Sequence, residues 1–215
     1  DESLIVEETP PCFRGLLPFA AYLPPALLSR EVLLRGALWV TPGHRMTRHD
    51  LLLLCAHEGF PGHHLAACHL AAQPSRTRRA LGGPMLTGWS LYVEDLLPEL
   101  ARDAALAQRS PKDALALALA TARGRLWRAL RVVLDAGLHC GGLTLEEAAE
   151  LLTTRLGFTR EQSLAEVRRV SLRPMEALTA FLGAQQIREA RAAAQAQPDF
   201  SLLAFHRQVL MGELG

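Results

Sequence analysis

The sequence predicts an all-α protein, a mainly helical domain with a small β element near its N-terminus. Helix start signals, in which a Thr is followed three residues later by an acid or Gln, recur along the chain after residue 45. Apolar stretches long enough for helices follow these signals. Proline and short β-like runs are concentrated before residue 45 instead, so the two parts of the chain differ in local structure.

Residues 1–45 are predicted to form an extended, proline-rich arm that belongs to the same domain as the helices. Two runs in this arm have β character, "SLIVEE" and "GALWVTP", so that one or two strands are expected. Residues 46–215 then make up the helical domain.

The first helix is expected to begin at Thr47, with Asp50 completing a capping box, and to run through "LLLLCAHE". The second covers "TGWSLYVEDL", and Pro98 ends it or begins the next segment. A long helix is expected from Ser110-Pro111 to Gly141-Gly142, because proline is favoured at a first helical position and glycine after the last one.

Two more capping boxes predict the starts of the next two helices, Thr144 with Glu147 and Thr159 with Gln162. Pro174 starts "MEALTAFLGAQQIREARAAA", and "FSLLAFHRQVL" forms the last helix. No fixed-period repeat is visible, which disfavours a solenoid.

The bulk properties narrow the possible functions. At 215 residues the chain suits one medium domain, and its formal net charge is +1. Its arginines are interspersed with acids, which argues against nucleic acid as a partner. No apolar run reaches the roughly 20 residues of a membrane span. The four cysteines form no C-x-x-C pair, which disfavours a structural zinc ion bound by thiolates. No signal peptide is visible, so we expect a cytoplasmic protein.

Half of the chain's eight histidines lie in "CAHEGFPGHHLAACH", residues 55–69. His57 and Glu58 begin like the zinc-peptidase motif H-E-x-x-H, but Pro61 stands where the second histidine belongs. Proline has no N–H for the carbonyl of His57, so the helix must kink or stop there. His64 lies two turns from His57 on the same helix face. His63 can reach the position of a second ligand beside His57 only if the Pro61-Gly62 segment forms a bulge or turn.

Such a cluster suits one zinc ion, because neutral imidazoles and a carboxylate can hold zinc while leaving a position for water. Glu58 would then accept a proton from that water as general base. The alternative is a helix end with a few histidines near the surface, and His69 is expected to be only packed or solvated.

The string "HEGFPGHHL" resembles the H-E-x-x-P-G-H-H signature of the bacterial domain of unknown function 885 family, whose members resemble zinc metallopeptidases of the carboxypeptidase Taq fold. Further blocks that match in order cover nearly the whole chain: "GWSLYVEDL", "RALRVVLDAGLHCGGLTLEEA", "EVRRVSLRPMEALTAFLGAQQIREAR" and "FSLLAFHRQVLMGELG". Members of that family are usually much longer. The resemblance therefore implies that residues 46–215 are the C-terminal part of a longer architecture. Its N-terminal helical half would be missing here or supplied separately. The alternative is that the chain forms a homo-oligomer.

The resemblance implies that His57 and one of His63 and His64 are metal ligands, with Glu58 as base. It also implies a third ligand from the glutamate that opens the family's E-G-W block, a position that holds Thr87 here. Threonine is a poor zinc ligand, so this difference bears directly on activity. Glu94 lies seven residues on, on the same helical face, and could replace the missing ligand or support the others.

Asp135 and His139 share a helix face at spacing i, i+4. His139 could donate to the oxyanion of a tetrahedral intermediate while Asp135 fixes its tautomer, or the two could form a simple helix pair. Tyr92 is a further candidate for an oxyanion contact, and a buried structural tyrosine is the alternative.

Two more pairs of residues complete the candidates. Arg128 and Arg131 could bind a substrate carboxylate through two parallel hydrogen bonds, although most arginines in such a chain are only solvated. Trp89 and Trp127 are expected in the core.

The best-supported hypothesis is a zinc-dependent hydrolase, a metallopeptidase or carboxypeptidase-like enzyme acting on a peptide or small amide. An alternative from another class is a catalytically impaired pseudoenzyme or partner subunit, which keeps the fold but has lost a ligand at Thr87 and exposes a large apolar surface when isolated. A third is a metal-dependent enzyme of small-molecule metabolism on the same fold.

Overall fold

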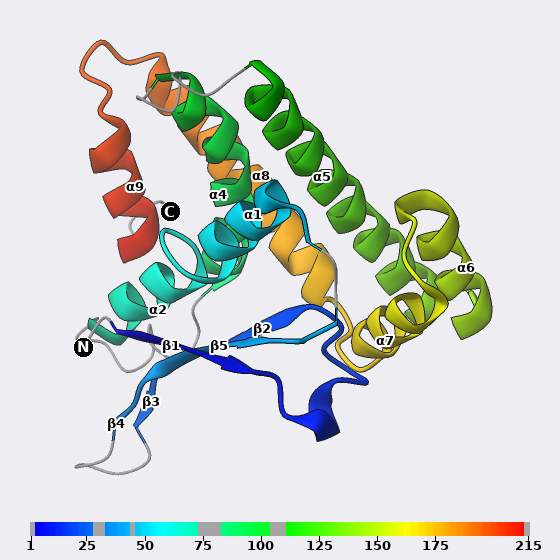
Figure 1. Cartoon of the computed structure of the whole chain (residues 1–215). Helices are drawn as coiled ribbons and strands as arrows, with labels where there is room; N and C mark the ends of the chain where they lie inside the picture. The colour runs from blue at the N-terminus through cyan, green and yellow to red at the C-terminus, as the bar shows by residue number, and fades with distance from the viewer. Residues whose placement is uncertain (1–2, 28–32, 44–45, 73–82, 104–110, 213–215) are drawn as a thin grey trace.

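The structure of the chain is a computed structural model that describes residues 3–27, 33–43, 46–72, 83–103 and 111–212. Helices make up most of the described residues, and a small sheet lies near the N-terminus (Figure 1). The predicted fold class is therefore confirmed. The sheet runs beneath α1 and α2, while α4, α5 and α8 form the helical layer above it and α6 and α7 lie at one side.

The sheet contains three strands in the order β1-β5-β2: β1 (Leu4–Glu8), β5 (Gly36–Val40) and β2 (Ala20–Leu23). β1 pairs with β5 in parallel, and β2 pairs with β5 in antiparallel orientation. The two strands expected from the sequence are confirmed as β1 and β5. Three strands were not predicted: β2, β3 (Ala26–Leu27) and β4 (Leu33–Leu34), the last two of which pair with each other. A short 3-10 helix, η1 (Pro11–Phe13), follows β1.

The histidine-rich segment forms two helices rather than one. α1 (Arg48–Glu58) begins at the predicted capping box, in which the Thr47 hydroxyl accepts from Asp50 N and the Asp50 carboxylate accepts from Thr47 N. It ends directly before Pro61, as the missing N–H requires. The chain then turns and starts α2 (His63–Ala72), which was not predicted.

α4 (Gly83–Asp103) continues through Pro98, so the expectation that this proline ends the helix or begins a new segment is wrong. α5 (Pro111–His139) spans the predicted range, and Ser110 lies outside the described residues. Both remaining capping boxes are confirmed, at the starts of α6 (Leu145–Leu156) and α7 (Arg160–Ser171).

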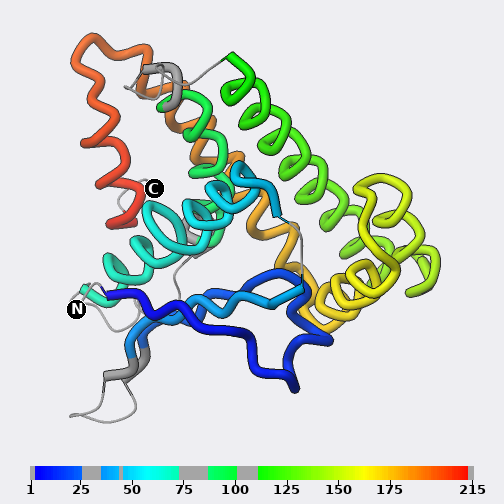
Figure 2. Tube along the Cα trace, in the orientation of Figure 1, coloured from blue at the N-terminus to red at the C-terminus, as the bar shows by residue number. Residues whose placement is uncertain are grey.

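The last two helices, α8 (Glu176–Gln195) and α9 (Leu202–Met211), begin within two residues of their predicted starts. The tube in Figure 2 shows α9 standing beside α2, with the C-terminal end of the described chain near the turn between α1 and α2. Met175 precedes α8 with φ 69°, a left-handed conformation that is unusual for a residue with a side chain.

The core contains one large apolar cluster around α4, α8 and α9 and a second one around α5, α6 and α7. α4 and α8 approach closely at Gly88, where an added Cβ would lie 2.0 Å from Ala184 N. Trp89 is buried in the first cluster, as predicted. Trp127 is partly buried against the second, with its ring 4.9 Å from that of Phe19.

One face of α5 carries an exposed apolar stripe whose members are spaced alternately by four and three residues. The stripe consists of Leu115, Leu119, Ala122, Leu126, Ala129, Val133 and Ala136. This spacing matches the a and d positions of a heptad, the pattern with which one helix packs along another. Within the described ranges, no helix has the length and apolar character needed to cross a membrane.

Candidate functional site

The turn between α1 and α2 brings the two halves of the histidine motif together. An added Cβ at Gly62 would lie 1.9 Å from the carbonyl oxygen of His57, so only glycine fits where α2 starts against the end of α1. Trp89 Nε1 donates to the Pro61 carbonyl at 2.6 Å and ties the turn to α4. As a result, the rings of His57 and His63 lie 4.9 Å apart, nearly perpendicular to each other.

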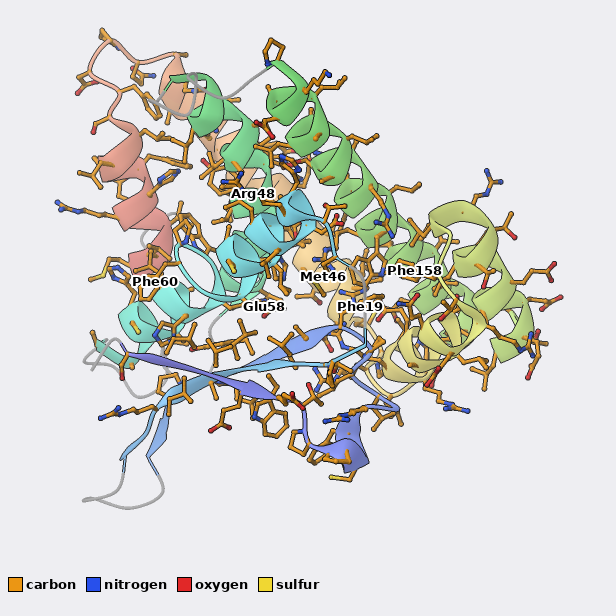
Figure 3. The ribbon with its side chains drawn as sticks, viewed as in Figure 1. Phe19, Met46, Arg48, Glu58, Phe60 and Phe158 are labelled. Carbon is orange, nitrogen blue, oxygen red and sulfur yellow. The ribbon has the colours of Figure 1, made fainter. Side chains whose placement is uncertain are left out.

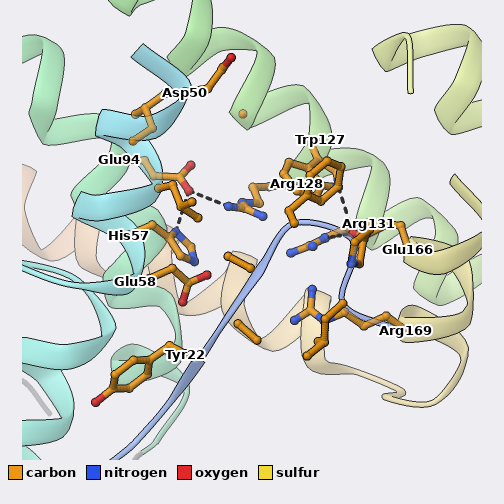
Figure 4. A pocket seen from close by; sticks show the side chains of 18 of the residues that line it. Tyr22, Asp50, His57, Glu58, Glu94, Trp127, Arg128, Arg131, Glu166 and Arg169 are labelled. Atoms are coloured by element: carbon orange, nitrogen blue, oxygen red, sulfur yellow. Dashed lines mark hydrogen bonds and ion pairs between the residues drawn. The ribbon is translucent and has the colours of Figure 1, made fainter. Parts of the chain in front are cut away.

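His57, Glu58 and His63 form a compact cluster in which one potential ligand atom from each lies within 4.8 Å of the others. Figure 3 shows Glu58 at the end of α1, above the strands. The close-up in Figure 4 shows His57 and Glu58 on the wall of a cavity whose opposite side carries Arg128, Arg131 and Arg169. The turn that the sequence analysis required for His63 is therefore present.

Glu94 and Arg128 hold His57 from behind. Glu94 Oε1 lies 2.7 Å from His57 Nδ1 and accepts from Arg128 Nη2 at 2.7 Å. Burial alone would raise the pKa of Glu94, but Arg128 and His57 together hold it well below its usual range. Glu94 is therefore a carboxylate that orients the imidazole and leaves the opposite ring nitrogen for an ion, as metal-ligating histidines commonly show.

His63 is held as a neutral imidazole. Its Nε2 lies 3.1 Å from the hydroxyl oxygen of Ser90 on α4. Burial, followed by the neighbouring His57 and the charges of Arg128 and Arg169, lowers the pKa of His63 to about 3. A neutral ring is the form of histidine that can bind a metal at neutral pH.

His64 faces away from this cluster. Its Nδ1 lies 2.9 Å from the hydroxyl of Tyr22 on β2, and its Nε2 lies 3.8 Å from Cys68 Sγ. It is fully buried, and β5 packs so tightly on it that a Cβ at Gly36 would lie 2.7 Å from Nδ1. Of the two histidines left open by the sequence, His63 joins His57, and the assignment of His64 as a ligand is not supported by this placement.

The donors that converge here fit zinc. Imidazoles are common zinc ligands, and the buried carboxylate on His57 is the usual support for such a ligand. Thr87, at the position where the family resemblance implies a glutamate, lines the same cavity. Glu94 is occupied by His57 and Arg128, so Glu58 is the carboxylate that remains beside the two rings.

The cavity in front of the cluster has a volume of about 890 Å³, which is enough for a small peptide. Its walls come from the β2 region, α1, α4, α5 and the segment from α6 to α7. Trp127 contributes an aromatic wall, and the guanidinium groups of Arg128 and Arg131 lie over its ring at 4.7 and 4.5 Å. Both arginines line the cavity, as a role in binding substrate requires.

Asp135 and His139 lie elsewhere. Neither is among the described residues that line the cavity. His139 Nδ1 lies 2.8 Å from the Asp135 carbonyl oxygen and 3.0 Å from Asp135 Oδ1, while Nε2 lies 3.2 Å from the Ser171 carbonyl oxygen. Asp135 Oδ1 also accepts from Met175 N at 3.0 Å. The pair therefore ties α5 to the turn before α8, and this placement gives no support for its expected oxyanion role.

Tyr92 is likewise a core residue rather than a wall of the cavity. It is buried, and its hydroxyl lies 2.8 Å from His206 Nε2 on α9. In the part of the chain that the structure describes, Tyr92 borders neither this cavity nor the smaller recess beside it. The alternative reading of Tyr92, as a buried tyrosine with a satisfied hydroxyl, matches this environment.

Several residues of the site were not predicted from the sequence: Tyr22, Ser90, Glu166, Arg169, Arg173 and Glu176. Most of them reach the cavity only through the packing of α7 and α8 against α5, which leaves no local signal.

Comparison with known families and structures places the chain among bacterial proteins. A family model described as a bacterial protein of unknown function (DUF885) matches residues 1–214. No curated protein matches the chain.

Two solved structures share the fold. A candidate lipoprotein from Colwellia psychrerythraea is 28% identical with a TM-score of 0.79, and the match covers 97% of this chain and 35% of that one. A candidate lipoprotein of unknown function from Shewanella oneidensis is 23% identical with a TM-score of 0.69, covering 98% of this chain and 38% of that one. The chain thus spans little more than a third of the length of these relatives.

Proposed function

The chain belongs to the bacterial DUF885 family, and from the site described above we propose that it is a zinc-dependent hydrolase of peptides or related small amides. One observation carries this proposal: ligand atoms of His57, Glu58 and His63 converge within 4.8 Å on the wall of a large cavity. The buried support of both histidines, by Glu94 and by Ser90, strengthens it, because solvated histidines at a helix end need no such partners.

In this proposal His57 and His63 hold the ion. Zinc in such a site supplies a Lewis acid that lowers the pKa of water and polarises a carbonyl group. Glu58 accepts a proton from the water that attacks the amide carbon, and it returns this proton to the leaving nitrogen as the C–N bond breaks. Glu94 and Arg128 keep the ring of His57 in place throughout.

The first test is the metal content of the chain purified without chelator or affinity-tag metal, measured by elemental mass spectrometry. We expect about one zinc ion per chain, lost in His57→Ala and in His63→Ala. His69→Ala is the matched control, because it removes an imidazole from the same helix as His63 at a residue that borders neither described cavity. Metal that survives both cluster substitutions would contradict the proposal.

Hydrolysis is the second test. Metal-loaded protein is incubated with a mixture of short peptides, and products are identified by mass spectrometry with Glu58→Gln as control. Cleavage that needs both the added zinc and Glu58 supports a metallopeptidase. Cleavage of non-peptide amides alone would instead assign the site to small-molecule metabolism.

A second candidate function is that of a catalytically impaired partner subunit, and two observations favour it. Thr87 stands where the family resemblance implies a ligand, and the heptad-spaced stripe on α5 is exposed. Because the solved relatives are nearly three times as long, an apolar helix of their additional chain is the natural occupant of such a stripe. Little bound zinc and no hydrolysis, together with self-association of the isolated chain that Leu119→Glu removes, would favour this candidate.

We also propose a location at the cell envelope in place of the cytoplasmic one expected from the sequence. The support is the description of the Colwellia psychrerythraea relative as a candidate lipoprotein. Cell fractionation of the native host, with detection by antibody, tests this assignment.

A further inference from the structure

A small recess of about 90 Å³ opens beside the metal-binding cluster and shares much of its wall with the main cavity. One side of it consists of His57, His63, Thr87 and Ser90, and the opposite side carries four arginines: Arg128, Arg131, Arg169 and Arg173. The carboxylate of Glu176 also lines the recess, and apolar side chains complete its wall: Leu91, Val170, Ala177 and Ala180. The recess therefore has room for one small polar group, held between the cluster and a set of cations.

The arginines lie directly next to the cluster. A single oxygen, Glu94 Oε1, lies 2.7 Å from both His57 Nδ1 and Arg128 Nη2. Arg128 therefore links the guanidinium side of the recess to the carboxylate that contacts His57. Figure 4 shows the side chains of Arg128, Arg131 and Arg169 across the main cavity from His57 and Glu58.

The four guanidinium groups have only three carboxylate partners among the described residues. Glu94 pairs with Arg128, and Glu166 pairs with Arg131. Glu176 is shared, accepting from Arg169 Nη2 at 3.0 Å and from Arg173 Nη1 at 3.2 Å.

Two of the guanidinium groups, those of Arg169 and Arg173, thus share one carboxylate. In addition, Arg128 Nε is buried without a hydrogen-bond acceptor in the described structure. Both features suit an anion that is absent until substrate binds.

We propose that this recess binds the free α-carboxylate at the C-terminus of the substrate, with Arg169 and Arg173 as its main contacts, so that the enzyme removes the last residue of a peptide or hydrolyses an N-acyl amino acid. The inference rests on the proposed hydrolase function. Arg169 and Arg173 are assigned because their shared partner leaves donors to spare, and guanidinium groups bind planar carboxylates through paired hydrogen bonds. The apolar walls then favour a small, uncharged last residue.

Equilibrium binding to chelator-treated protein tests the recess without depending on catalysis. The probes are N-acetyl-Ala-Ala with a free C-terminus and the same compound as its C-terminal amide, measured by isothermal titration calorimetry. We expect the free acid to bind about tenfold or more tightly than the amide, because one charge-assisted pair is lost in the amide. Arg169→Gln should abolish this difference.

Arg168→Gln is the matched control, since Arg168 is the exposed neighbour on α7 and lines neither cavity. Arg173→Gln, at a side chain that is 58% exposed, gives a second variant that folds even if Arg169→Gln does not. Equal binding of acid and amide, or an equal loss in Arg168→Gln, would overturn the assignment. Displacement of the acid by inorganic phosphate at lower concentration than by acetate would also overturn it, in favour of a phosphorylated ligand.

The two proposals fail separately. If the acid binds selectively but the chain holds no zinc, the hydrolase proposal fails and the carboxylate site stands. If zinc-dependent cleavage occurs on amidated and free peptides alike, the hydrolase stands and the carboxylate site fails.

Discussion

Among the described residues, two buried carboxylates contact a histidine, and the pairs differ in what the histidine faces. Glu94 lies 2.7 Å from His57, and Asp135 lies 3.0 Å from His139. His57 is directed toward Glu58, His63 and a large cavity, whereas both nitrogens of His139 meet carbonyl oxygens of the protein itself. A carboxylate–histidine contact alone therefore does not identify a site. The remaining nitrogen must face other ligands and open space.

The largest expected effect comes from Glu58→Gln, which keeps the shape of the side chain but removes its basicity. We expect zinc-dependent hydrolysis to fall by roughly 10²–10⁴-fold, the usual contribution of a general base, while bound zinc stays unchanged. The measurement is the rate of peptide cleavage alongside metal content. Loss of zinc together with activity would instead make Glu58 a ligand, and full activity in this variant would rule out its role as base.

Glu94→Gln addresses the support of His57 and should have the next largest effect. We expect zinc affinity to fall by about 10–100-fold, because an amide orients the imidazole less strongly and leaves Arg128 without its buried partner. Competition with a chromogenic chelator measures this affinity.

Asp95→Asn is the control for Glu94→Gln, because Asp95 is the neighbouring residue on α4 but pairs with Arg125 and Arg188 instead. A zinc affinity that falls as much in this control would mean that the effect comes from α4 as a whole. The comparison of the two carboxylate–histidine pairs would then lose its basis.

The sequence predicted what short-range chemistry determines. The capping boxes at Thr47, Thr144 and Thr159 each involve residues three positions apart, and all three are confirmed. Pro61 correctly predicted the break after α1. Pro98 did not end α4, because the packing of this helix against the rest of the core outweighs the loss of one backbone hydrogen bond.

The site was predictable only in part, for the same reason. His57, Glu58 and His63 are close in the chain, and a single turn decides their arrangement. The recess depends on Arg169 and Glu176, which reach the cluster through the packing of α5, α7 and α8. Asp135 and His139 show the opposite error, since their i, i+4 spacing was read correctly but says nothing about whether a cavity lies nearby.

Asp135→Ala probes the second carboxylate–histidine pair and should change stability without changing the site. Asp135 is buried and accepts from Met175 N, so removal of its side chain leaves that donor without its partner and takes the carboxylate contact from His139. We expect the free energy of unfolding in urea to fall by about 1–3 kcal/mol. Zinc content and cleavage rate should stay at the level of the unchanged protein, and a selective loss of cleavage would restore the catalytic role expected from the sequence.

The smallest effect concerns the protonation of His139. Both ring nitrogens lie against oxygen acceptors, which only the doubly protonated ring can satisfy, so hydrogen bonds to the carbonyl oxygens of Asp135 and Ser171 raise its pKa. A group whose pKa is higher in the folded state stabilises the protein fully below its unfolded pKa, near 6.5, and this contribution disappears as the pH rises through the folded value. The difference in Tm between the unchanged protein and His139→Gln should therefore be larger at about pH 5.5 than at about pH 8.5. An equal difference at both pH values would mean that His139 gains no proton affinity on folding, so that one nitrogen could still donate to a substrate.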